Sequence, residues 1–383
     1  MLLFSTVMFA VVLFGICTEG KVQGATLVAQ WEFDGDFTAA NDSLYDGIAS
    51  PGVTFVCRAD GQAANFDGGF GPGNNNPDID HVDSSELTSA SEFNGGFSIM
   101  GWINARKLDT ILSHDQSSSP FFGFSLFPIP DGRVILVLRD KTQGTMQAET
   151  PFGTVTSNKW THVTTTWDGD PSGSGIKFYI NGLLVPTILN PHNGIFVGLN
   201  STGSLPVRIG ATFADGANNM AGIDGSLDHI SLWKGVLTQQ EILADHNNTK
   251  TPAISSGGFQ SPMDKGPVTV KKNRVLPLKA EFLDENGIPV TDLDVTAPPV
   301  LQVIYDSGNP ATDPIDVTKD ALSAGHGTDG NQFEYDSSSG RWKFNLMTKN
   351  YTAIGTYIIS MVAGSECEYI IESVPTATFV LNE

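Results

Sequence analysis

The chain has 383 residues, of which 16% are charged, and it carries a formal charge of −21 at pH 7. The length is enough for two or three domains, and 41 Gly and 21 Pro indicate many short strands separated by turns. An acidic surface repels nucleic acid and anionic membranes, whose binding needs Lys and Arg against phosphate, and it attracts cations. We therefore expect no nucleic-acid partner.

The N-terminal segment has the features of an export signal. An apolar run covers residues 2–17, which is too short to span a bilayer comfortably, and Val22, Gly24 and Ala25 suit a cleavage site. We predict that residues 1–24 are a signal peptide and that the mature chain is secreted or held at the cell surface, without membrane insertion. An uncleaved anchor is the alternative. Removal takes away Glu19 and Lys21, so the charge stays at −21 (20 basic against 41 acidic residues).

Two cysteines remain in the mature chain, Cys57 and Cys367. They lie in what we expect to be different domains, so a disulfide would have to join the two domains. We predict two buried free thiols instead. The sequence has no Cys-x-x-Cys pair, so it does not support cysteine-based zinc or redox chemistry.

The residues that follow the signal alternate like β-strands. Residues 27–33 alternate polar and apolar side chains and end in the turn Asp34-Gly35-Asp36. The Gly-, Asn- and Asp-rich residues 66–80 fit no regular element and predict an exposed loop. Turn-bounded apolar segments begin near residues 97, 121, 133, 159, 176 and 206, at intervals typical of an antiparallel sandwich.

Residues 223–241 combine a strand with the start of a helix. Leu227, Ile230 and Leu232 are the apolar members of the strand. Thr238 and Glu241 form a capping box, because the hydroxyl can accept a hydrogen bond from the third helical N–H while the carboxylate reaches back to the N–H of the cap. We expect the closing strand of a sheet followed by one short helix.

Four segments of residues 25–248 carry a family resemblance. They read, in order, WTHVTTTWDG, KFYINGLLV, VRIGA and IDGSLDHISLWKGVLTQQEI. This order resembles the laminin G-like jelly roll of the concanavalin A-like lectin superfamily, also seen in pentraxins. Gly225, Leu227, Asp228 and Ile230 match its penultimate motif, whereas His229 stands where an acid is common. The resemblance implies an antiparallel jelly-roll β-sandwich.

A second β-rich unit follows a linker at residues 249–257, which are rich in Thr, Ser, Gly and Pro. Residues 258–383 resemble a small immunoglobulin-like module found at the C-termini of exported bacterial proteins. The matching residues are Pro262, Pro277, Leu278, Lys279, Phe333, Tyr335, Gly340, Trp342, Thr348, Gly355 and Tyr357. The predicted fold class is therefore all-β, a jelly-roll sandwich followed by an immunoglobulin-like β-sandwich.

Catalytic carboxylates are the first candidate site, because the same superfamily includes glycoside hydrolases. Retaining enzymes need two carboxyl groups about 5 Å apart, and the family resemblance implies Glu, Asp and Glu close together on one strand. The sequence has no such run. It has two Glu-x-Asp pairs, Glu32 with Asp34 and Glu334 with Asp336, each at a strand end. Nucleophile-elbow, HExxH and phosphate-loop motifs are also absent. We predict that the chain is not an enzyme.

Calcium is the predicted cofactor, in a structural role, because exposed loops rich in Asp and Asn supply the oxygen ligands that it prefers. One group joins Asp34, Asp36 and Asp42 near the first strand with Asp228 near the last, if the terminal strands pair as in the family. The alternative is that these side chains form turns with their own backbone.

A second predicted calcium group is similar to the rim site of laminin G domains. It joins Asp115 with Asp215, Asn218 and Asn219 in the loop before Ile223. Turn formation is the alternative here too.

Sugar binding requires exposed aromatic side chains flanked by polar groups. Phe121, Phe122 and Tyr179 are the candidates, whereas the tryptophans at 102, 160, 167 and 233 lie in apolar alternation and are assigned to the core. The predicted function is non-catalytic binding of an extracellular glycan through calcium-supported rim loops. A structural or adhesive protein that binds another surface protein is the alternative, and a glycoside hydrolase is the third possibility.

Overall fold

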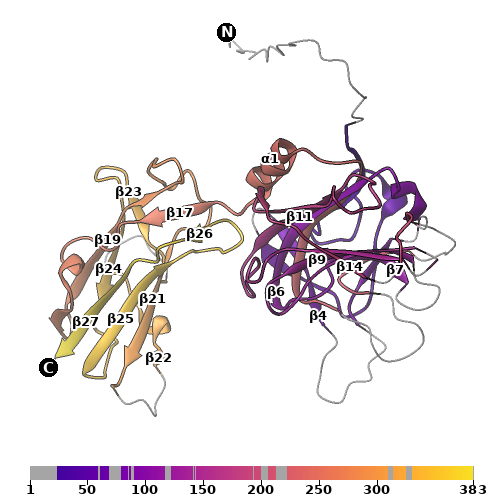
Figure 1. The fold of residues 1–383 in the computed structure, drawn as a ribbon. Coiled ribbons are helices and arrows are strands. Elements are labelled where there is room, and N and C mark those ends of the chain that lie inside the picture. Colours follow the sequence, from indigo (N-terminus) through magenta and orange to yellow (C-terminus); the bar gives the residue numbers. More distant parts are fainter. Residues whose placement is uncertain are drawn as a thin grey trace, which may run out of the picture.

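The computed structural model describes residues 24–58, 61–68, 79–84, 86–87, 90–116, 122–140, 142, 144–192, 194–199, 206–212, 222–308, 314–324 and 330–382. They form two β-rich domains (Figure 1). The first domain ends with the helix α1 (Gln239–Thr249), and the second begins at the strand β17 (Ala253–Ser256).

The first domain contains two eight-stranded sheets. Sheet A has the order β13-β12-β11-β6-β16-β4-β3, with β1 also paired to β16. Its strands are β1 (Thr26–Trp31), β3 (Thr54–Arg58), β4 (Gly61–Asp67), β6 (Phe97–Lys107), β11 (Thr161–Trp167), β12 (Lys177–Ile180), β13 (Leu183–Val185) and β16 (Asp224–Lys234). Every pairing in sheet A is antiparallel.

Sheet B has the order β14-β10-β9-β8-β7-β15-β5-β2. Its strands are β2 (Ile48–Ala49), β5 (Val82–Ser84), β7 (Leu112–Gln116), β8 (Phe122–Pro128), β9 (Val134–Arg139), β10 (Thr145–Glu149), β14 (Ile188–His192) and β15 (Val207–Ile209). The non-consecutive neighbours in both sheets are the crossings of a jelly roll, so the predicted all-β jelly-roll fold is confirmed.

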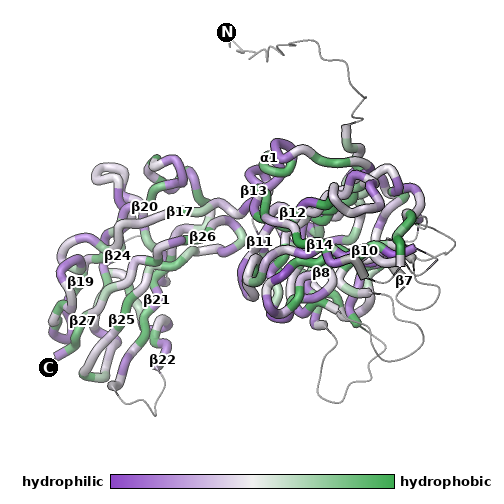
Figure 2. Tube along the Cα trace, viewed as in Figure 1, coloured by the Kyte–Doolittle hydropathy of each residue, from purple (hydrophilic) through white to green (hydrophobic). Residues whose placement is uncertain are grey.

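The core of the first domain lies between the two sheets. Alternate side chains of each strand point into this space, because successive side chains of a strand face opposite ways. Large aromatic residues fill it, and the rings of Phe97 and Phe124 stack with their centroids 4.6 Å apart. Figure 2 shows hydrophobic and hydrophilic residues alternating along the strands of both domains.

Residues 223–241 have a more central place than the sequence indicated. β16 lies inside sheet A, between β6 on one side and β1 and β4 on the other, rather than at an edge. The predicted capping box of α1 is confirmed, since the Glu241 N–H donates to Thr238 Oγ1 at 3.2 Å and the Thr238 N–H donates to Glu241 Oε2 at 2.7 Å. α1 covers part of the outer face of sheet A, where Ile242 packs against Met100 and Tyr179.

The second domain has its own core and three sheets, with the orders β20-β17-β26, β18-β27-β25-β21-β22 and β19-β24-β23. Its other strands are β18 (Val268–Lys271), β19 (Val275–Ala280), β20 (Phe282–Leu283), β21 (Val300–Asp306), β22 (Ile315–Asp316), β23 (Glu334–Asp336), β24 (Arg341–Met347), β25 (Gly355–Val362), β26 (Ile370–Ile371) and β27 (Thr376–Asn382). The linker is shorter than the predicted residues 249–257 and consists of residues 250–252. The residues after it form β17, which pairs in parallel with β26. The immunoglobulin-like identity of this domain stays a prediction.

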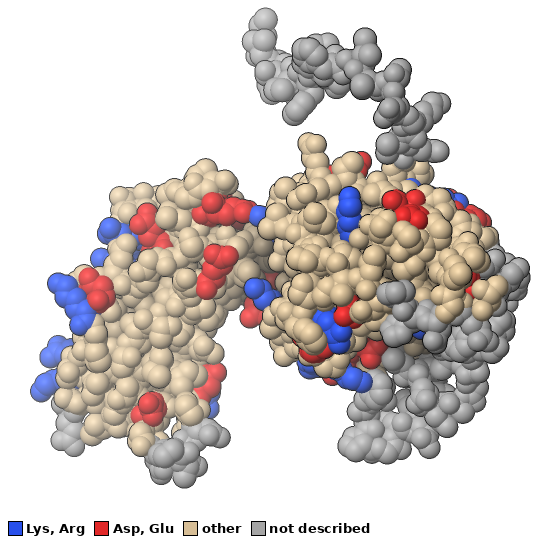
Figure 3. All heavy atoms as spheres, viewed as in Figure 1, with Lys and Arg blue, Asp and Glu red and all other residues tan. Residues whose placement is uncertain are grey.

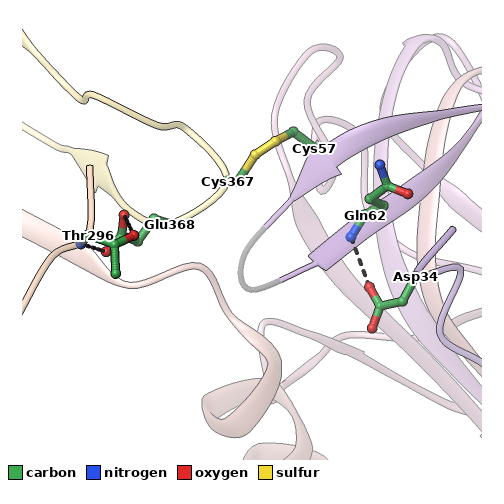
Figure 4. The surroundings of a disulfide bond; sticks show 6 residues. All are labelled: Asp34, Cys57, Gln62, Thr296, Cys367 and Glu368. Carbon is green, nitrogen blue, oxygen red and sulfur yellow. Dashed lines mark hydrogen bonds between the residues drawn. A yellow bond between two sulfur atoms is a disulfide. The ribbon is translucent and has the colours of Figure 1, made fainter.

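A disulfide joins the two domains, so the prediction of two buried free thiols is wrong. Cys57, an exposed residue of β3, bonds to Cys367 in the loop before β26, and their Cα atoms lie 5.0 Å apart (Figure 4). Lys250 Nζ also lies 2.5 Å from Glu285 Oε2 across the junction.

In the part of the chain that the structure describes, no helix is long and apolar enough to cross a membrane.

Candidate functional site

The outer face of sheet B carries polar side chains along β10. Met146 and Ala148 of this strand point into the core, so Gln147 and Glu149 point outward. On the neighbouring β9 the outward residues Ile135 and Val137 are apolar, and they lie opposite Glu149 and Gln147. On this face the amide of Gln147 is partly exposed, whereas Ile135, Val137 and Glu149 are buried.

Phe152 lies at the end of this face, in the loop after β10. Its side chain is 73% exposed, and it is the one aromatic among the large hydrophobic side chains that are exposed in the described residues. The guanidinium of Arg133 lies over its ring, with Cζ 4.5 Å from the ring centroid. This distance is within the range of a cation–π contact, which fixes the orientation of the ring at the surface.

The loop of Phe152 is tied to the turn between β8 and β9. The Gly153 N–H donates to the Asp131 carbonyl at 3.0 Å, and the Val155 N–H donates to the Gly132 carbonyl at 2.9 Å. The approach requires glycine at position 132, where φ is 84° and an added Cβ would lie 2.5 Å from the Val155 carbonyl oxygen. Two turns therefore hold one another in a fixed shape around the aromatic ring.

The charges beside Phe152 are paired, and Asp131 and Arg133 reach solvent, whereas Glu149 is buried. Arg133 Nη2 lies 2.9 Å from Asp131 Oδ2, and Arg133 Nη1 lies 2.9 Å from Glu149 Oε2. The hydrogen bond from Arg133 lowers the pKa of Asp131, and the bonds to Asp131 and Glu149 raise the pKa of Arg133. Gln147 Nε2 donates to Glu149 Oε2 at 3.4 Å. We call Asp131, Arg133, Gln147, Glu149 and Phe152 the Arg133–Phe152 rim.

This rim has the chemistry for a ligand with one apolar face and several hydroxyl groups. The ring of Phe152 offers a flat apolar surface, while the carboxylates accept and the guanidinium and amide donate hydrogen bonds. Phe152 was not among the predicted site residues, because it lies in a loop and not in one of the predicted strands. The signal was the tripeptide Pro151-Phe152-Gly153, in which a phenylalanine sits between two turn residues.

The predicted aromatic platform is not confirmed at the residues chosen for it. Phe121 lies outside the described residues, and Phe122 begins β8 with a side chain that is not described. Tyr179 is 5% exposed and packs against Leu237 and Ile242 under α1, so the prediction for it is wrong. Trp167 lies in the sandwich core as expected, whereas Trp102 is buried beneath α1 instead.

The fold does not bring the residues of the first predicted calcium group together as a metal site. Oδ1 of Asp34 accepts the Gln62 N–H at 2.8 Å (Figure 4). Asp36 and Asp42 accept the N–H groups of the residues two positions further on, at 2.9 and 3.0 Å. Asp228 forms an ion pair with Arg58. Across the described ranges, no group of three or more His, Cys, Asp or Glu side chains could hold a metal ion, so Asp36 and Asp42 follow the turn alternative.

The second predicted calcium group lies largely outside the described residues. Asp215, Asn218 and Asn219 belong to residues 213–221, which the structure does not describe. Asp115 is in β7, opposite Gly123 of β8, and its side chain is not described. Calcium at this group therefore stays a prediction.

Buried charges lie between sheet A and α1, away from the rim. Nε2 of His162 lies 3.0 Å from Asp245 Oδ2, and Nε2 of His229 lies 3.5 Å from Asp245 Oδ1. Burial alone would raise the pKa of Asp245, but the hydrogen bonds from the two histidines lower it to about 2. Burial raises the pKa of Asp228 to about 6, although Arg58 opposes this. Covered by the helix, these groups hold α1 to the sheet.

The two carboxylate pairs weighed for catalysis bond to neighbouring groups. Glu32 Oε1 accepts the Gln30 side-chain amide at 2.9 Å. The hydroxyls of Ser338 and Ser339 bond to Asp336 and lower its pKa to about 2. A general acid needs a raised pKa, so Asp336 is unsuited to that role.

A cavity of about 500 Å³ lies at the domain junction, beside the disulfide. Three of its acidic side chains accept backbone N–H groups. Asp284 accepts from Ile288 and Asp294 from Thr291, so these two carboxylates shape their own turns. Glu368 accepts from Thr296 (Figure 4) and from Ala297, and it therefore joins two segments that are distant in the chain. On the face visible in Figure 3, acidic and basic side chains are dispersed among uncharged residues.

Comparison with known proteins bears on the first domain. Residues 79–243 match the family model of the concanavalin A-like lectin/glucanases superfamily. No curated protein matches the chain.

Solved structures are similar at low sequence identity. Domain 4 of an extracellular arabinanase from Geobacillus stearothermophilus, in complex with arabinotriose, is 15% identical with a TM-score of 0.41, covering 58% of this chain and 98% of that one. The carbohydrate-binding module of a Ruminococcus gnavus sialidase bound to α2,3-sialyllactose is 17% identical with a TM-score of 0.32, covering 40% and 84%. A pentraxin from Limulus polyphemus is 21% identical with a TM-score of 0.32, covering 45% and 77%. The family match and the sheet order confirm the resemblance found in the sequence, and the matched residues 79–243 lie within the jelly-roll domain, which also contains β1 to β4.

Proposed function

We propose that the mature chain is an extracellular, non-catalytic recognition protein that binds a neutral glycan at the Arg133–Phe152 rim. The observation that carries the proposal is Phe152, an aromatic side chain that is 73% exposed and held by Arg133 beside hydrogen-bonding groups. An exposed phenylalanine loses the favourable free energy of burial unless a ligand covers it. The match of residues 79–243 to a superfamily that includes lectins supports the same function.

The chemistry of the rim favours an uncharged sugar. The C–H face of a pyranose can stack on the Phe152 ring, while its hydroxyls bond to the accessible groups of Asp131, Gln147 and Arg133. Asp131 and Glu149 carry two negative charges against the single positive charge of Arg133, so a sialylated or sulfated sugar would meet net repulsion. Because the two turns are already tied together, little conformational entropy is lost on binding.

Glycan binding is tested on an array of neutral and acidic glycans with the mature chain, Phe152→Ala and Leu293→Ala. Leu293 is a matched control, because it is 92% exposed and lies in the second domain. We expect the parent and Leu293→Ala to bind the same neutral glycans and Phe152→Ala to lose them. No binding by the parent would reject the proposal and favour the structural or adhesive alternative. Turnover of a bound polysaccharide would reject the non-catalytic part.

We also propose that calcium binds at Asp115 with Asp215, Asn218 and Asn219, in a structural role. The carboxylate and amide oxygens of these residues support this, because calcium prefers oxygen ligands, as does the net charge of −21, which attracts cations. Thermal unfolding with calcium and with a chelator is the test, because a ligand of the native state raises the midpoint. An equal midpoint of thermal unfolding in both conditions would show that calcium does not bind. The array repeated with chelator tells whether the rim depends on the metal.

A further inference from the structure

The strands β13 and β14 form the same edge of the sandwich. β13 is the last strand of sheet A and β14 is the last strand of sheet B, and residues 186–187 connect them. Each strand pairs with a neighbour on one side, β12 for β13 and β10 for β14. The backbone groups of the other side of each strand can therefore accept a further strand.

This edge exposes an unusual number of aliphatic side chains. Six large aliphatic residues between positions 183 and 197 are 40–82% exposed in the described structure. They are Leu183, Leu184, Ile188, Leu189, Ile195 and Val197, which we call the β13–β14 edge. Clustered exposed apolar residues of this kind mark an interaction surface more often than single ones do.

The edge also has no charge. Residues 178–207 contain no Asp, Glu, Lys or Arg, although the whole chain has 42 acidic and 21 basic residues. Edge strands of soluble monomers are commonly very short, or carry a charge, a proline or a bulge that blocks pairing with another molecule. β13 has three residues and β14 contains Pro191, but neither strand contains Asp, Glu, Lys or Arg, so no charge opposes contact at this edge.

The chain's own second domain is attached at the far side of sheet A. β3, at the opposite end of the strand order from β13, carries Cys57 and hence the disulfide to Cys367. The second domain is therefore held at the β3 edge and is not available to cover β13.

We propose that the β13–β14 edge binds a second copy of this chain. Two molecules that each carry a charge of −21 repel one another, and this repulsion is least where both surfaces are uncharged. A basic partner would instead gain most at an acidic surface. Two β13 strands related by a two-fold axis can pair antiparallel, which extends sheet A across both copies while the aliphatic side chains cover one another.

A dimer of this kind would bring two glycan sites together. Ile188 of β14 lies opposite Glu149 of β10, so the β13–β14 edge borders the Arg133–Phe152 rim. Two rims in one particle would bind a repeating glycan more tightly than one rim, by raising the effective concentration for the second contact.

Sedimentation velocity over a range of concentrations tests the surface. We expect the mature chain to dimerise, the double variant Leu184→Lys with Ile188→Lys to remain monomeric, and the control Leu293→Lys to dimerise like the parent. Circular dichroism and an unchanged thermal midpoint show that the variants are folded. A parent that stays monomeric, or a double variant that dimerises like the control, would overturn the proposal. If the parent is monomeric and the double variant loses glycan binding, the β13–β14 edge contacts the glycan and not a second copy of the chain.

Cross-linking tests the strand pairing separately. Leu184 is the middle residue of β13, so a two-fold antiparallel pairing brings the two copies of this position close together. Mild oxidation of Leu184→Cys should give a disulfide-linked dimer on a non-reducing gel, whereas Leu293→Cys should not. Equal yields from the two variants would contradict pairing at this edge.

Discussion

Phe152 and Gly132 illustrate how single residues make the rim. The phenylalanine ring is useful as a ligand platform only because the turn beneath it has a fixed shape. That shape depends on an N–H of one turn meeting a carbonyl of the other, and this approach leaves no room for a side chain at position 132. The functional residue and its supporting glycine therefore form one unit.

Substitution of Gly132 should disturb this unit more than substitution of its neighbour Gly153. Both glycines have a positive φ, 84° and 71°, but an added Cβ meets the Val155 carbonyl oxygen at 2.5 Å at Gly132 and nothing within 4 Å at Gly153. Gly153→Ala should cost about 1 kcal/mol of unfolding free energy from its backbone conformation. Gly132→Ala should cost clearly more and also weaken glycan binding. Equal losses in denaturant unfolding would show that the close approach is unimportant.

The residues of the predicted calcium sites show which side-chain roles could be predicted from the sequence and which could not. Asp and Asn beside Gly read equally well as turn residues or as cation ligands, because both uses need the same exposed oxygens. For Asp36 and Asp42 the local backbone accounts for the carboxylates. Asp228 could not be placed from the sequence, because its partner Arg58 is distant in the chain and close only through the pairing of β16 with β4 and of β4 with β3.

The helix α1 is held to sheet A partly by ionisable side chains, Asp245 of the helix and the histidines of the sheet. Burial alone would lower the pKa of His229, but the hydrogen bond to Asp245 and the negative charges of Asp245, Asp228 and Glu32 together raise it. A raised histidine pKa stabilises the fold at pH values below the unfolded value, and the stabilisation is lost as the pH rises through the folded value. Burial lowers the pKa of His246, which stacks on Trp102, and this acts in the opposite direction. The effect of His229 is therefore best isolated by substitution.

His229→Asn tests this contact. Asparagine tolerates the positive φ of 52° at this position but carries no charge. The variant should lower the thermal midpoint of the first domain most at about pH 5, where His229 is protonated in the folded chain, and less at about pH 8. A loss of stability that is the same at both pH values would mean that packing rather than charge is responsible.

The elements of the first domain follow closely from the sequence. Alternation of apolar residues predicted the strands, and the spacing of Thr238 and Glu241 predicted the start of α1, because both signals are local. The centre of sheet A and the covering of its outer face are not local. Tyr179 was predicted to be exposed, but α1 packs over it, and His162 is buried beneath the same helix.

For the whole molecule, the disulfide decides how the two domains are held. Each domain has a separate core, and the linker of residues 250–252 is short. The two cysteines could not be paired from the sequence, because β3 and the loop before β26 meet only in the folded molecule. The linker was predicted too long for a related reason: residues 253–256 have the composition of a linker, and their strand partner Ile370–Ile371 is far away in the chain.

Removal of the disulfide should free the domains without unfolding them. In Cys57→Ser with Cys367→Ser, we expect protease cleavage at residues 250–252 to become faster and the radius of gyration to increase. The thermal midpoints of the two domains should change little, since neither cysteine belongs to a core cluster. Unchanged cleavage and size would mean that contacts such as Lys250 with Glu285 already hold the junction.

Whether Phe152 forms the glycan site is measured by calorimetric titration of the strongest neutral glycan from the array into the mature chain, Phe152→Ala and Leu293→Ala. We expect Phe152→Ala to bind about tenfold more weakly or worse, equivalent to about 1.4 kcal/mol, and Leu293→Ala to bind like the parent. Equal affinities for all three proteins would contradict the assignment of the Arg133–Phe152 rim as the glycan site.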